Sequence, residues 1–132
     1  MIALRILVIE DEAMIAMLLS DVLSSLGHVV TDLAATEEEA IASASHTMPD
    51  LVIADANLGE GNGNGLTAID TILESGFIPH VFVSGDSRSI QILRPDAIVM
   101  QKPFFEHELV SAIDRAIARA DGKMTQSAGG SV

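Results

Sequence analysis

Short apolar runs alternate along the whole chain with segments in which apolar residues recur at helical spacing. The runs are rich in valine, isoleucine and leucine and are bounded by turn residues, a pattern that predicts strands buried in a sheet. The segments between them carry apolar residues three, four and seven positions apart, which predicts helices with one face toward a core. The predicted strands cover residues 4–9, 28–33, 51–55, 80–84 and 97–100. The predicted helices lie at 13–26, between the Thr36 capping box and Pro49, at 66–76, between Ser87 and Arg94, and at 106–120.

The first predicted helix shows the clearest periodicity. Gly27 stands where a helix C-cap is expected. Met17 falls on the outer face of this helix with Ala13 beside it, where the two offer an adaptable apolar patch to a partner helix. The residues predicted to face the core are Ile15, Leu18, Leu19, Val22 and Leu26.

The apolar pattern that predicts the fourth helix is weaker than the one that predicts the fifth. The fourth has only Ile90, Ile92 and Leu93 as apolar residues before Arg94 and Pro95 stop it, so we expect a short or mobile segment. The fifth is strongly periodic. The small, polar and glycine-bearing stretch 121–132 is expected to be a disordered tail. The inward residues of the fifth helix are predicted to be Leu109, Ile113, Ala116 and Ile117.

The alternation of five strands with five helical segments predicts a doubly wound parallel α/β sheet. A flavodoxin-like strand order of 2-1-3-4-5 is the natural expectation. The 132 residues suit one domain, which we place at residues 1–120.

Composition and charge limit the kinds of partner that the protein can bind and the cellular compartment in which we expect it. The chain is 48% hydrophobic with four phenylalanines as its only aromatic residues, and it contains no cysteine, which excludes disulfides and thiolate metal sites. Its formal net charge of −12 opposes binding to nucleic acid or to an anionic membrane. The N-terminus does not read as a signal peptide, and no apolar stretch approaches a membrane span. We expect a cytoplasmic protein whose partner is another protein or a cation.

Polar residues stand at the ends of four predicted strands. In the expected order the first and third strands are neighbours, so Glu10, Asp11 and Asp55 should meet at one edge of the sheet. Clustered carboxylates repel one another and invite a divalent cation, and Mg²⁺ prefers oxygen ligands. Ser84 and Lys102 arrive at the same edge. A carboxylate nucleophile, a metal, a hydroxyl and an ammonium are the parts needed to pass a phosphoryl group onto Asp55.

These motifs occur in the order found in a known family. Over residues 4–120 the chain resembles the receiver domain of two-component response regulators, here of the stand-alone, single-domain type. Receivers are signalling domains rather than enzymes acting on an external substrate. The motifs that carry the resemblance are Glu10-Asp11, Asp55, Ser84 and Lys102-Pro103-Phe104.

The resemblance implies a role for each residue at the predicted edge. Asp55 would be phosphorylated by a histidine kinase in a reaction that requires Mg²⁺. The phosphorylated domain would then switch its binding to an unknown downstream protein, or would serve as a phosphate shuttle or a phosphate sink. Lys102 and Ser84 would contact the phosphoryl group, and the peptide bond from Lys102 to Pro103 would be cis. The implied metal ligands are Glu10, Asp11, Asp55 and the backbone carbonyl of Asn57.

The chain departs from the usual receiver pattern in several places. Val99 stands where receivers usually carry an aromatic residue, so we predict that the signal travels through the loop from Ser84 to Ile90. The ten-residue loop after Asp55 is longer than usual and has Gly59 in place of a common proline, and the stretch from Ser84 to the site lysine is short. Phe82-Val-Ser-Gly85 is similar to the Phe-Ala-Thr-Gly stretch of an alphaproteobacterial subgroup of single-domain receivers, whose pattern the next two residues do not complete.

Other functions fit the sequence less well. A pseudo-receiver that binds partners without phosphorylation would not need the complete acidic site. A small metal-dependent phosphatase with an aspartyl intermediate would place an Asp-x-Asp pattern after the first strand, whereas Glu10-Asp11-Glu12 lacks that spacing. Flavin binding is disfavoured by the few aromatic residues. The glycine-rich loop lacks the Gly-Lys-Ser/Thr ending of a phosphate-binding P-loop.

Overall fold

The computed structural model describes residues 2–130, with the side chains of the last helix described as far as Gly122. Strands and helices alternate without exception along the chain, as the apolar pattern predicts. The strands are β1 (Arg5–Ile9), β2 (Val29–Ala34), β3 (Leu51–Asp55), β4 (His80–Ser84) and β5 (Val99–Gln101). The helices are α1 (Ala13–Ser25), α2 (Glu37–Thr47), α3 (Gly65–Leu73), α4 (Ser87–Leu93) and α5 (Glu106–Gly130).

The five strands form one sheet in the order β2-β1-β3-β4-β5, and every neighbouring pair is parallel. Both the fold class and the predicted strand order are confirmed. Because β1 and β3 are neighbours, with Ile9 paired to Ala54, the residues that follow both strands emerge at the same edge. The point where the strand order reverses lies between these two strands, and ligands of open α/β sheets bind there.

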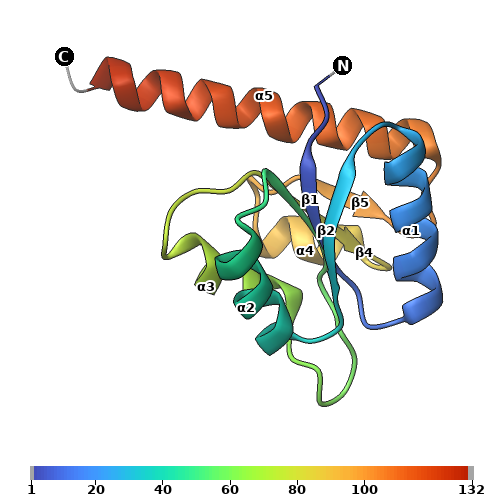
Figure 1. Ribbon diagram of the computed structural model, residues 1–132. Coiled ribbons are helices and arrows are strands. Elements are labelled where there is room, and N and C mark those ends of the chain that lie inside the picture. Colours follow the sequence, from blue (N-terminus) through green and yellow to red (C-terminus); the bar gives the residue numbers. More distant parts are fainter. Residues whose placement is uncertain (1, 131–132) are drawn as a thin grey trace.

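Helices cover both faces of the sheet (Figure 1). Alternate residues of β1 serve opposite faces because side chains along a strand point up and down in turn. Ile6 and Val8 pack with Leu23 of α1 and Leu109 of α5, whereas Leu7 and Ile9 pack with residues of α2 and α3. A strand such as β3, in which all five residues are buried, is therefore apolar until its last position, Asp55.

The helix ends follow local sequence signals. The Thr36 hydroxyl accepts a hydrogen bond from the Glu39 amide at 3.1 Å, and the Glu39 carboxylate accepts one from the Ala35 amide at 2.8 Å, as expected near a capping box. Gly27 follows α1 with a positive φ of 93°, a conformation that glycine adopts without strain. These caps set where each helix begins and ends relative to the strand edge.

The inward face of α1 is rotated from the predicted one. Its buried residues are Ala16, Leu19 and Leu23, whereas the predicted core residue Leu18 is 61% exposed. Each residue of an α-helix is rotated by about 100° from the one before it, so a face centred on these three buried residues leaves Leu18 on the outer side. Met17 is also 61% exposed, so its predicted outward position is confirmed.

The last two helices, α4 and α5, differ greatly in length. As predicted, α4 is short, at seven residues, and none of those seven is buried. The helix expected to end at Ala120 continues to Gly130, because the residues that follow Ala120 include no proline to interrupt its hydrogen bonds. The placement of the domain boundary at residue 120 stays a prediction. None of the helices within the described residues combines the length and apolar character that crossing a bilayer requires.

Candidate phosphate and metal site

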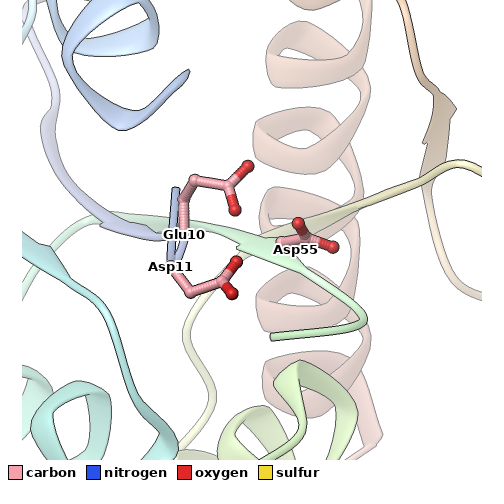
Figure 2. A group of neighbouring side chains, drawn as sticks. All are labelled: Glu10, Asp11 and Asp55. Atoms are coloured by element: carbon pink, nitrogen blue, oxygen red, sulfur yellow. The ribbon is translucent and has the colours of Figure 1, made fainter. Parts of the chain in front are cut away.

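Three acidic side chains meet where β1 and β3 end. Figure 2 shows Glu10 and Asp11, which follow β1, pointing toward Asp55 at the end of β3. One carboxylate oxygen from each of the three can be chosen so that all lie within 4.8 Å of one another. Glu10 and Asp55 are buried, and Asp11 is half-buried. Hard oxygen donors at this separation suit a Mg²⁺ ion, so the residues present fit the metal that the fold family implies.

Lys102 follows β5, the strand at the edge of the sheet, and its side chain reaches this cluster. Its ammonium donates a hydrogen bond to Asp55 Oδ2 at 2.6 Å and one to Glu10 Oε1 at 3.0 Å. The peptide bond that follows, Lys102 to Pro103, is cis, as the resemblance implies. The structure thus brings together four of the predicted site residues from the ends of three strands.

The carboxylates and the ammonium change one another's acidity. The pKa of Glu10 is raised from 4.5 to about 7: burial is the largest cause and the nearby Asp55 adds to it, while the hydrogen bond from Lys102 opposes both. Partial burial lowers the pKa of Lys102, but its bonds to Asp55 and Glu10 outweigh that effect and hold the pKa above its usual value. The ammonium lies closer to Asp55 than to Glu10. Glu10 therefore takes up a proton near neutral pH, above the usual range of a carboxyl group.

This arrangement predicts a pH dependence of stability in the absence of metal. Above pH 4.5 the unfolded chain releases the Glu10 proton, whereas the folded chain keeps it until about pH 7. The unfolded state then binds fewer protons, so the free energy of unfolding falls as the pH rises through this window, by on the order of 2 to 3 kcal/mol. Lys102 titrates well above this window. We expect Glu10→Gln to gain stability relative to wild type between pH 5 and pH 8, measured by urea unfolding in a chelator. A stability difference that stays constant across this range would contradict the prediction.

The loop between β3 and α3 holds Asp11 from the other side. Asn62 Nδ2 donates to Leu58 O at 2.9 Å and lies 3.4 Å from Asp11 Oδ2. A Cβ atom at Gly59 would lie 2.8 Å from the same Asp11 oxygen, and the φ of Gly59 is +82°. Proline is locked near −65°, so this loop cannot carry the proline usual in receivers. The contact of Asn62 with Asp11 was not predicted from the sequence. The one feature that marks Asn62 there is its position within the glycine-rich loop.

The remaining predicted residues lie at the same edge without contacting one another closely. The backbone amide of Asn57 donates a hydrogen bond to Asp55 Oδ1 at 3.0 Å. The side-chain oxygen of Asn57 accepts one from the Gly59 backbone amide at 3.0 Å. Ser84 ends β4, next to β3, and its hydroxyl oxygen accepts from the Asp86 amide at 2.9 Å. The metal and phosphate roles assigned to these residues stay predictions.

Comparison with known proteins now identifies the family. The family model of the response regulator receiver domain matches residues 6–114, and the chain belongs to this family. Among characterised relatives, the phyllosphere-induced regulator PhyR of Methylorubrum extorquens is 36% identical over 118 residues, which cover 87% of this chain and 44% of PhyR. The transcriptional regulatory protein PdtaR of Mycobacterium tuberculosis is 33% identical over 119 residues, covering 87% of this chain and 57% of PdtaR. The chain thus spans about half the length of these relatives.

Solved structures give the same family. The receiver domain of PhyR from Erythrobacter litoralis is 32% identical, with a TM-score of 0.78 over 87% of this chain and 90% of that domain. The anti-anti-sigma factor PhyR from Bartonella quintana is 30% identical, with a TM-score of 0.85 over 96% of this chain and 52% of that protein. The suspected membership of the Phe-Ala-Thr-Gly subgroup stays a prediction.

Proposed function

We propose that this receiver domain is a phosphorylation-dependent switch that accepts a phosphoryl group on Asp55 from a histidine kinase. The observation that carries the proposal is the 2.6 Å hydrogen bond from the Lys102 ammonium to Asp55, at the centre of a buried acidic cluster. A strand-end carboxylate that only capped a loop would not need an ammonium from another strand.

The transfer itself asks little covalent chemistry of the protein. A carboxylate oxygen of Asp55 forms a bond to phosphorus while the bond from phosphorus to the donor histidine nitrogen breaks, and that imidazole takes up a proton to leave neutral. Lys102, which bonds Asp55, would hold the negative charge that spreads over the phosphoryl oxygens. Ser84 would donate its hydroxyl proton to one of these oxygens once the loop after β4 moves inward.

Glu10, Asp11 and Asp55, with the backbone carbonyl of Asn57, would hold Mg²⁺. When bound, the metal supplies positive charge that draws the phosphoryl oxygens toward Asp55. Glu10 must be deprotonated to serve as a ligand, so its raised pKa means that metal binding would weaken as the pH falls through about 7.

An exposed apolar surface lies close to the site and suits a kinase helix. Met14 and Leu18 of α1 are 77% and 61% exposed, and Met17 lies between them. A groove beside them runs between α1 and the segment after β5, where Phe104 and Lys102 line it. Flexible methionine side chains adapt to apolar partners, so a helix that packs here could bring its histidine to Asp55.

The direct test is phosphorylation by a small phosphodonor. Wild-type protein incubated with acetyl phosphate and Mg²⁺ should gain the mass of one phosphoryl group, and a chelator should prevent the gain. Transfer from candidate histidine kinases then identifies the physiological donor. An unchanged mass with both kinds of donor would favour a pseudo-receiver that binds its partners without phosphorylation.

Phosphorylation should act mainly on the loop after β4, because β5 carries Val99 where other receivers carry an aromatic switch residue. Val99 is half-buried against the core and has no polar group to swing toward the site. The phosphoryl group adds roughly 1.5 to 2 negative charges beside Ser84. We expect amide exchange to change on phosphorylation in residues 85–90 and to stay constant in α2, as read by mass spectrometry. Equal exchange in both states across residues 85–90 would refute this route.

The relatives suggest a kind of output. PhyR from Bartonella quintana is described as an anti-anti-sigma factor, and PdtaR as a transcriptional regulatory protein. We propose that the phosphorylated domain likewise changes its binding to another protein. A pull-down with each phosphorylation state would recover that partner.

A further inference from the structure

A single glutamine joins the site lysine to the loop before α4. Gln101 ends β5, directly before Lys102. Its side-chain Nε2 donates to Gly85 O at 2.7 Å and to Lys102 O at 2.9 Å, and its Oε1 accepts from the Ser87 amide at 2.9 Å. Both ends of the amide group are thus engaged with backbone, across the gap between β5 and the loop after β4.

This contact matters because α4 has little apolar anchorage. None of its seven residues is fully buried, and Ile90 packs against the core only half-buried, so the position of the helix depends largely on polar contacts. Its C-terminal end is fixed by Gln91, which donates to Pro95 O and Ala97 O at 3.0 and 2.9 Å, and by the ion pair of Arg94 with Asp70. Its N-terminal end is linked to β5 by the hydrogen bond from the Ser87 backbone amide to the Gln101 side chain.

The same glutamine adjoins the reacting groups. The Lys102 amide donates to Ser84 O at 2.8 Å, while the Lys102 ammonium bonds Asp55. A change at Asp55 that draws Lys102 or Ser84 inward therefore pulls on the backbone groups that Gln101 spans. The usual receiver couples these places through an aromatic side chain, and Val99 cannot do so here.

We propose that Gln101 is a positioning residue that clamps the loop Gly85–Ser87 in its resting place and transmits the state of Asp55 to the start of α4. The coupling half of this proposal rests on the proposed phosphorylation of Asp55. The clamping half concerns the unmodified protein alone. Loss of the clamp frees the loop to move with Ser84, so the phosphoryl group is accepted more readily when the clamp is absent.

The test compares two substitutions at Gln101 with a matched control. Gln101→Met keeps the length of the side chain and removes its hydrogen bonds, whereas Gln101→Glu keeps an acceptor for the Ser87 amide but cannot donate to Gly85 O. Gln91→Met removes a glutamine that also bonds backbone carbonyls, at the opposite end of α4. All three variants should fold, because both glutamines are exposed.

The first readout is amide exchange of Ser87 in unmodified protein. We expect about tenfold faster exchange in Gln101→Met, the size of effect that losing one to two net hydrogen bonds produces. Gln101→Glu should also lose protection at Ser87, because its second carboxylate oxygen would face Gly85 O and Lys102 O, and Gln91→Met should leave Ser87 unchanged. Unchanged exchange in Gln101→Met overturns the clamp.

The second readout is the rate of phosphorylation by acetyl phosphate with Mg²⁺. We expect a severalfold faster rate in Gln101→Met than in wild type and no change in Gln91→Met. Faster Ser87 exchange with an unaltered phosphorylation rate overturns the coupling. If wild type accepts no phosphoryl group, the proposed function and the coupling both fail, whereas the exchange data still decide the clamp.

Discussion

Replacing Asp55 by asparagine is expected to abolish phosphoryl acceptance completely. An amide is not a nucleophile toward phosphorus under these conditions, and the site offers no second carboxylate in the same position relative to Lys102. The asparagine oxygen can still accept from Lys102 in place of Oδ2, so only the hydrogen bond that Oδ1 accepts from the Asn57 backbone amide is lost. The variant should therefore remain folded by circular dichroism while its mass stays unchanged after treatment with acetyl phosphate and Mg²⁺.

Asp50→Asn is the matched control for this experiment. Asp50 precedes the same strand at its opposite end, where its carboxylate accepts a hydrogen bond from the Arg5 amide at 2.8 Å. This control should gain a phosphoryl group at the wild-type rate. A mass gain in Asp55→Asn equal to that of wild type would show that another residue is the acceptor.

Replacing Gly65 by alanine is expected to destabilise the fold by about 3 kcal/mol or more, a large value for overpacking. A Cβ atom there would lie 1.9 Å from the carbonyl oxygen of Asp55 and 3.2 Å from the Cα of Ala56. Both neighbours are backbone atoms and cannot rotate away, so α3 or the end of β3 must shift. Urea unfolding would measure the loss, and a variant that still folds should accept phosphate more slowly because Asp55 has moved.

Gly85→Ala is the control for this second prediction. A Cβ atom at Gly85 would meet no atom within 4 Å, and its backbone does not adopt a positive φ. Its free energy of unfolding should stay within about 1 kcal/mol of wild type. An equally small effect at Gly65 would show that the close approach of α3 to β3 is not a requirement of the fold.

The sequence carried enough information to predict the sheet and most of the site. Strands buried on both faces leave a continuous apolar signal, and a polar residue at the end of such a run, such as Asp55, can only lie at the edge. Strand order then determined which ends are neighbours. This is why Glu10, Asp11 and Lys102 could be assigned to one place before any coordinates were known.

The rest depended on distances that a pattern of residue types does not record. Apolar residues of α1 stand on more than one side of the helix, so the pattern alone does not decide whether Leu18 or Leu23 faces the sheet. The links made by Asn62 and Gln101 depend on loop conformations, because glutamine and asparagine at loop and strand ends are ordinary surface residues in most proteins. The sequence therefore indicated which groups meet at the site but not which groups hold them in place.

The lack of buried residues in α4 has a consequence for how this surface can change. Arg88, Ile92 and Leu93 are exposed and make no contribution to the interior, so substitutions at these positions should leave stability almost untouched. Recognition of a new partner could be acquired here without a compensating change elsewhere. A library randomised at these three positions would offer a way to redirect the output of the domain while its chemistry at Asp55 is preserved.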